Sequence, residues 1–117
     1  MGFQFLDWLF GEFMNGPKII DPIAQRKLTF GRSSIIVQIG RPEISEDDFM
    51  CAYSISSGGQ EKLGHAMGMD SVQALQLALV SIEIDLKALA RSSGQEITWL
   101  EDTPGNTGFS ALNLGGN

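Results

Sequence analysis

The hydrophobic pattern of residues 3–14, FQFLDWLFGEFM, has the spacing of a helix. Gln4, Asp7 and Gly11 recur every three or four residues, and apolar side chains fill most of the other positions. The sequence Asn-Gly-Pro at 15–17 then ends the pattern, since Pro cannot continue a helix. We therefore predict a short aromatic helix over residues 3–14, followed by a linker through residue 22.

From residue 24 the hydrophobic period changes to two, which is typical of strands. Residues 24–30 and 35–39 are predicted to form a hairpin, and residues 49–55 a third strand. Between them, GRPEISEDD at 40–48 is predicted to be a loop. Residues 62–67 are a possible fourth strand after a Gly-rich turn. The apolar positions that share one strand face are Ala24, Leu28, Phe30, Ile35, Val37, Ile39, Phe49, Cys51, Tyr53 and Ile55.

A long helix is predicted from residue 71. Asp70 and Gln73 form a capping-box pattern at its start, and Gly94 ends it. The predicted apolar stripe consists of Val72, Leu75, Leu79, Ile82, Leu86 and Leu89. The positions predicted to face away are Gln73, Gln76, Glu83, Lys87 and Arg91. Residues 97–100 are strand-like, and the segment after them is rich in Gly and Asn.

This order of elements predicts an α+β fold, with an antiparallel sheet of three to four strands and the long helix on one face. The other face, to which Ile36 and Met50 would point, needs cover, and the aromatic N-terminal helix is the candidate. The alternative is that this helix forms an interface, either within a homodimer or with the partner. We expect three segments: the N-terminal helix and linker (1–22), a single α+β domain (23–109) and a Gly/Asn-rich tail (110–117).

Composition and charge narrow the classes of partner. The chain has 117 residues, of which 43% are hydrophobic, enough for one modest core. Its net charge of -6 disfavours binding to nucleic acid or to an anionic membrane and favours a basic partner. The single cysteine, Cys51, indicates a reducing compartment. No basic residue precedes Lys18, so residues 3–14 do not resemble a secretory signal, and we expect a cytoplasmic protein.

A chain of short motifs resembles an uncharacterised bacterial domain family. These motifs are IAQRKLT (23–29), IGRP (39–42), F-x-C-x-Y-x-I (49–55), GMDSVQALQLAL (68–79), TWL (98–100) and GF (108–109). The family implies no activity that can be carried over. A looser similarity, to HicB-type antitoxins, lies in the outline of residues 68–75, where strands lead into a helix start. That likeness is one of architecture, which says little about function.

The residues offer little catalytic chemistry. Cys51 and His65 are the only thiol and imidazole, but Cys51 alternates with apolar residues on a strand face and is interpreted as a core residue. The glycines of residues 58–68 are interpreted as turns, because no phosphate-loop motif contains them. No metal-ligand spacing occurs around His65. We therefore expect no catalytic residue, no cofactor and no metal site.

The sequence-based hypothesis is a non-enzymatic binding protein, most concretely a bacterial immunity protein. It would neutralise a basic toxin domain by occluding its active site with an acidic surface. A HicB-like antitoxin or regulatory module and a small Cys-dependent hydrolase are the alternatives, and a homodimer is compatible with all three. The residues expected to bind the partner are Glu43, Glu46, Asp47, Asp48, Glu101, Asp102, Phe5, Trp8 and Phe10. The alternative for the acidic residues is a solvated loop that keeps the protein soluble.

Overall fold

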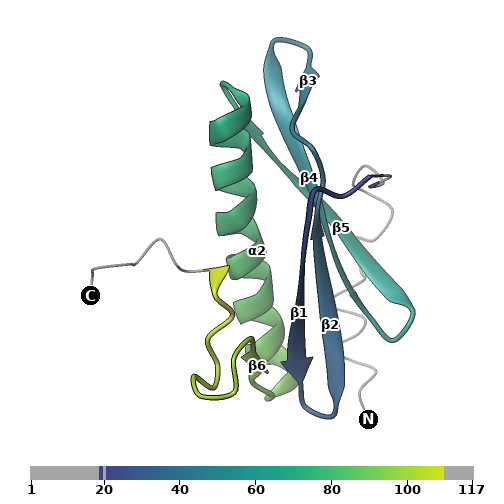
Figure 1. Ribbon diagram of the computed structural model, residues 1–117, viewed down its shortest axis with the longest axis vertical. Coiled ribbons are helices and arrows are strands. Elements are labelled where there is room, and N and C mark those ends of the chain that lie inside the picture. The colour runs from purple at the N-terminus through teal and green to yellow at the C-terminus, as the bar shows by residue number, and fades with distance from the viewer. Residues whose placement is uncertain (1–18, 20, 110–117) are drawn as a thin grey trace.

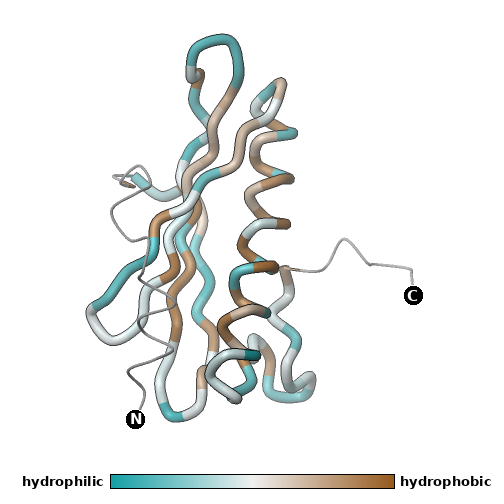
Figure 2. Tube along the Cα trace, turned by 180° about the vertical axis from the view of Figure 1, so that it is seen from behind, coloured by the Kyte–Doolittle hydropathy of each residue, from teal (hydrophilic) through white to brown (hydrophobic). Residues whose placement is uncertain are grey.

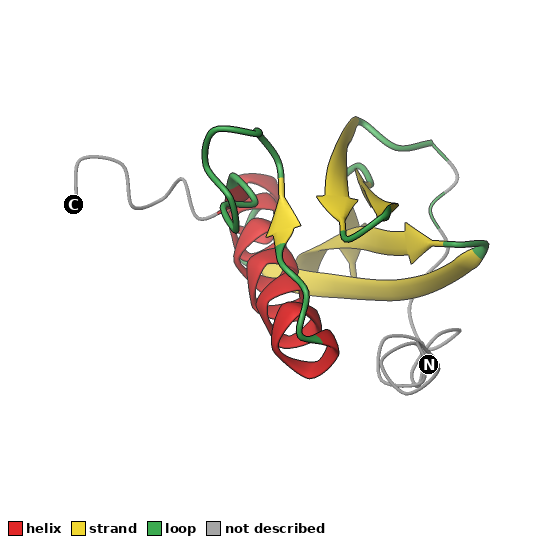
Figure 3. Cartoon of the chain, turned by 90° about the horizontal axis from the view of Figure 1, so that it is seen from below, coloured by secondary structure: helices red, strands yellow, loops and turns green. Residues whose placement is uncertain are grey.

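A computed structural model describes residues 19 and 21–109 of the chain (Figure 1). In this part, six antiparallel strands form a sheet that carries one long helix on one face (Figure 3). Each layer buries its apolar side against the other. The predicted α+β class is therefore confirmed.

The strands are β1 (Ala24–Phe30), β2 (Ser33–Ile39), β3 (Glu43–Ser45), β4 (Asp48–Ser57), β5 (Gln60–Gly68) and β6 (Ile97–Thr98). Strand β4 pairs with β5 along one edge and with both β2 and β3 along the other. Strand β2 pairs in turn with the whole of β1. Strand β1 pairs with β6 only at Thr29 and Phe30, so most of its outer edge carries no strand in the described part of the chain.

The sheet has more strands than the three to four that the pattern predicts. Strand β3 lies inside the predicted loop, because a tight turn at Glu46 and Asp47 lets it pair with the start of β4. Strand β5 is longer than the predicted residues 62–67. Gly58 and Gly59, both with positive φ, make the two-residue turn that extends this hairpin.

The helix α2 (Ser71–Ser93) begins and ends where its capping residues predict. The Asp70 carboxylate accepts a hydrogen bond from the Gln73 amide at 2.8 Å, and the Gln73 side chain accepts one from the Met69 amide at 2.7 Å. Gly94 is left-handed (φ 73°), and its N–H donates to the Ala90 carbonyl. The helix packs on the β4–β5 hairpin, as Figure 3 shows from one end.

The buried stripe of α2 differs from the prediction in its first half. Ala74 and Ala78 are fully buried there, whereas Val72 is 60% exposed. A Cβ atom on Gly68 of β5 would lie 2.3 Å from the Ala74 nitrogen, so helix and strand touch backbone to backbone and only small residues fit. The second half follows the prediction, with Ile82, Leu86 and Leu89 buried.

Two predicted segments, the aromatic helix over residues 3–14 and the tail at 110–117, lie outside the described residues. Ile36 and Met50 alternate with core residues and are half-buried on the sheet face away from α2. Within the described part of the chain, no helix combines the length and the apolar character needed to cross a membrane.

Candidate functional site

The turn between β3 and β4 gathers four carboxylates at one end of the molecule (Figure 1). Glu46 and Asp47 form the turn, Glu43 and Asp48 lie beside it on the paired strands, and all four residues are exposed. Glu46 has a φ of 59°, the only positive value among the described non-glycine residues. We call these four residues the acidic turn, which is visible as a hydrophilic tip in Figure 2.

Exposed apolar side chains occur at the same end. Ile44 of β3 is 73% exposed, Met69 is 81% exposed and Val72 in the first turn of α2 is 60% exposed. In the sheet, Ile44 lies opposite Phe49, and Phe49 lies opposite Gly68, the residue before Met69. We call Ile44, Met69 and Val72 the apolar tip. Gathered apolar side chains with a polar rim are typical of interaction surfaces.

The other predicted partner-binding residues are not found at this end. Glu101 and Asp102 are exposed in the loop after β6, at the opposite end of the molecule from β3 (Figure 1). The structure therefore does not join them to the acidic turn. The predicted anchors Phe5, Trp8 and Phe10 lie outside the described residues.

Cys51 and His65 point to opposite faces of the sheet. Cys51 is paired with Ala66, and His65 with Ala52, the next residue along β4. Because neighbouring side chains in a strand alternate between faces, the thiol faces the core while the imidazole is exposed on the other side. Burial raises the pKa of the Cys51 thiol, which disfavours the reactive thiolate. This arrangement argues against a Cys-His catalytic pair.

The guanidinium of Arg26 lies over two aromatic rings. Its Cζ atom lies 3.6 Å from the centroid of the Trp99 ring and 4.9 Å from that of Phe109. Nη1 donates a hydrogen bond to the Thr107 carbonyl oxygen at 3.3 Å. A Cβ on Gly108 would lie 2.4 Å from the Trp99 ring and 2.5 Å from Arg26 Nη1, so only glycine allows this approach. We call this arrangement the arginine clasp.

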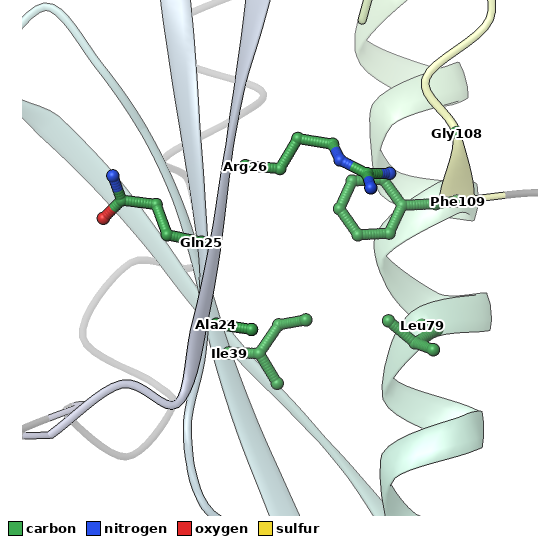
Figure 4. A pocket seen from close by; sticks show the side chains of 7 residues that line it. All are labelled: Ala24, Gln25, Arg26, Ile39, Leu79, Gly108 and Phe109. Atoms are coloured by element: carbon green, nitrogen blue, oxygen red, sulfur yellow. The ribbon is translucent and has the colours of Figure 1, made fainter.

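A cleft of about 270 Å³ lies beside the arginine clasp, between β1 and α2 (Figure 4). Ile39 from β2 and Leu79 from α2 point toward each other across it, and Arg26 and Phe109 lie at one end (Figure 4). Gln25 also lines the cleft, although its side chain points away from it (Figure 4). The residues that line the cleft are Ala24, Gln25, Arg26, Ile39, Leu79, Gly108 and Phe109.

A second polar contact holds the segment after β6 on the helix. The Thr107 hydroxyl donates a hydrogen bond to the Glu83 carboxylate, and Lys87 Nζ lies 3.4 Å from the same carboxylate. The Glu83 side chain is only 13% exposed, although the helical pattern predicts that it faces away from the core. Residues 107–109 are therefore held from both β1 and α2, which fixes one wall of the cleft.

A third polar group joins the sheet to the helix at the other flank of α2. The Tyr53 hydroxyl donates to Asp85 Oδ2, and Lys62 Nζ lies near Asp85 Oδ1. Burial, followed by the hydrogen bond and charge of Asp85, raises the pKa of Tyr53 well above its ordinary value. The phenol is thus a neutral donor, which suits a structural role better than acid-base chemistry.

Arg26 does not stand out in the hydrophobic pattern of β1. The residue sits on the core-facing side of β1, in the same alternation as Leu28 and Phe30. A cation at a core-facing strand position needs a partner or a function, because burying an unpaired charge is costly. That position is the signal in the sequence that could have identified it.

Comparison with known proteins gives a family match. Residues 24–111 match the family described as Domain of unknown function (DUF6968). Neither a search of curated proteins nor a search of solved structures found a match. The looser similarity to HicB-type antitoxins gains no support from these comparisons. The match covers most of the chain and all six strands, and the protein therefore belongs to the DUF6968 family of uncharacterised domains.

Proposed function

We propose that this protein is a non-enzymatic binding module that docks a protein partner on its β3–β4 end. The observation that supports the proposal best is the position of the apolar tip beside the acidic turn. Protein interfaces commonly combine an apolar centre with a charged rim that remains in contact with water.

The apolar tip would supply the affinity. Ile44, Met69 and Val72 are each at least 60% exposed. Fully burying one such side chain contributes roughly 1.5–3 kcal/mol. Met is also an adaptable contact residue, because its unbranched chain fits irregular surfaces. An occupant that covers all three side chains would recover most of this free energy.

The acidic turn would select a partner with a basic surface. Its four carboxylates are exposed, and the whole chain carries a net charge of -6. The negative electrostatic potential of these charges speeds association with a positively charged surface and disfavours acidic competitors. In its more specific form, the proposal is that the partner is a toxin with a basic active site and that this protein acts as an immunity protein. Occlusion of that site requires no catalytic group in this chain.

The first experiment is capture and direct binding. The full chain is immobilised and exposed to a lysate of the source organism, and a captured protein is then purified and titrated by calorimetry. We expect a partner with a basic surface. The double substitution Ile44→Ser and Met69→Ser should weaken its binding at least about tenfold. Glu46→Lys with Asp47→Lys should slow association and reduce its dependence on salt.

The matched control uses the other acidic pair. Glu101→Lys with Asp102→Lys makes the same change in net charge at the opposite end of the molecule and should leave the affinity nearly unchanged. Equal binding by the tip variants and the natural protein would contradict the proposal. For the immunity role, co-expression should suppress the toxicity of the captured protein, and the tip variants should fail to do so.

A further inference from the structure

The outer edge of β1 is open beside the cleft. Strand β6 covers only Thr29 and Phe30, so residues 24–28 have no neighbouring strand on that edge among the described residues. Gln25 of this strand lines the cleft although its side chain points away from it (Figure 4). An open strand edge offers amide and carbonyl groups that a ligand with a peptide bond can use.

Arg26 brings a positive charge to the same cleft. In the described part of the chain, no carboxylate lies within ion-pair distance of its guanidinium. A guanidinium has five N–H donors, and the structure assigns one of them to the Thr107 carbonyl. The two rings hold the group in place without using its remaining donors. The guanidinium is therefore positioned to bind an anion through a bidentate pair of hydrogen bonds.

The rest of the cleft is apolar and small. Ile39 and Leu79 face each other across it, and Ala24 adds only a methyl group at the rim (Figure 4). Its volume of about 270 Å³ is slightly below the roughly 300–1,000 Å³ typical of small-molecule sites. A short aliphatic chain fits these dimensions, whereas a nucleotide does not.

We propose that this cleft binds a small organic carboxylate, with the carboxylate on the free N–H groups of Arg26 and a short apolar chain between Ile39 and Leu79. The proposal is independent of protein docking at the β3–β4 end, because it uses no residue of the apolar tip or of the acidic turn. The same chemistry occurs in a free short-chain acid and in the C-terminal residue of a peptide. Only the peptide could also pair with the open edge of β1.

The test uses the full chain and nitrogen-edited NMR spectra. The two probes are 4-methylpentanoate, a free acid, and N-acetyl-leucine, which adds a peptide bond to the same apolar group and charge. Efficient ligands of this size bind with a Kd on the order of 1 mM. We expect saturable shifts confined to the amides around residues 24–26, 79 and 108. Tighter binding of N-acetyl-leucine would identify a peptide terminus as the natural source, and equal binding a free acid.

The uncharged amides of both probes test the role of the charge without any substitution. 4-Methylpentanamide and N-acetyl-leucinamide should bind at least about tenfold more weakly than the acids, because a charged hydrogen bond to Arg26 is lost. Equal binding of acid and amide would overturn the proposal. So would the absence of saturable shifts up to roughly 10 mM acid, well above the Kd expected for this size.

Two variants locate the site. Arg26→Gln should reduce affinity for the acids at least about tenfold, but it also removes the arginine clasp. Ala24→Phe is therefore the second variant, since it fills the cleft from an exposed position and leaves the clasp intact. Lys27→Gln is the matched control, because Lys27 is the next cation on β1 and points to the opposite face. Binding that survives Ala24→Phe, or that is lost equally in Lys27→Gln, would place the ligand elsewhere and overturn the proposal.

Discussion

The Tyr53 hydroxyl donates a hydrogen bond to Asp85 Oδ2 at 2.7 Å and thereby connects the centre of the sheet to the middle of α2. Lys62 approaches the other oxygen of the same carboxylate at 3.4 Å. All three side chains come from well-packed elements, and those of Lys62 and Asp85 are less than 20% exposed. The group is a polar link inside an otherwise apolar interface.

Removing the Tyr53 hydroxyl should destabilise the fold. In Tyr53→Phe, the Asp85 carboxylate keeps Lys62 but loses its shortest hydrogen bond in a half-buried site. We expect the free energy of unfolding to fall by about 1–3 kcal/mol, measured by urea denaturation. The control is Tyr53→Phe combined with Asp85→Asn. A double-mutant cycle with no coupling between the two positions would contradict this account.

Stability should also fall at alkaline pH. The pKa of Tyr53 is raised in the folded protein, whereas the unfolded chain ionises near pH 10. A raised folded pKa gives stability that is fully present below the unfolded value and lost as the pH rises above it. Above about pH 10, the contribution of Tyr53 should decline by up to about 1.4 kcal/mol per pH unit. Urea midpoints measured against pH, with Tyr53→Phe as the reference, isolate this contribution.

The same prediction has a spectroscopic check. Tyr53 is the only tyrosine in the chain, so tyrosinate absorbance reports this side chain alone. We expect that absorbance to rise together with the loss of helical circular dichroism. A reversible titration near pH 10 in a protein that remains folded would contradict the raised pKa.

Two glycines of β5 should respond differently to alanine. In Gly64→Ala the new Cβ would lie 2.5 Å from the Tyr53 ring, and in Gly68→Ala it would lie 2.3 Å from the Ala74 backbone nitrogen. A ring can rotate or shift, but a helix backbone must move as a whole. We expect a loss of about 1–3 kcal/mol for Gly64→Ala and a larger loss for Gly68→Ala, measured by thermal unfolding. The reverse order would indicate that α2 adjusts more easily than the Tyr53 ring.

The features that the sequence predicted correctly depend on contacts between residues close in the chain. Asp70, Gln73 and Gly94 define the ends of α2 through contacts within a few residues, and these ends were predicted correctly. Alternation likewise placed the core residues of β1, β2 and β4. The hydrophobic pattern does not contain the close approach of Gly68 to Ala74, so it selected the large Val72 for the buried stripe.

Features that depend on contacts between residues distant in sequence could not be predicted from the local pattern. Strand β3 lies in a segment rich in charged residues, so its composition does not predict a strand. It is stabilised by pairing with β4. Glu101 and Asp102 resemble the acidic turn in composition, but the path of the chain places them at the other end. The environment of Arg26 is formed by Trp99 and Phe109, which are distant in sequence and close in the fold, so the local pattern around Arg26 could not predict it.

The arginine clasp also joins two distant parts of the described chain. Arg26 and Thr107 are 81 positions apart, and the bond between them ties the first strand to the last described segment. A fragment that ended before Thr107 would therefore lose more than surface residues. It would remove one wall of the cleft and would take away the Phe109 ring and the Thr107 acceptor, leaving Trp99 as the only described ring beside the guanidinium. Residues 107–109 are thus part of what holds Arg26 on the first strand.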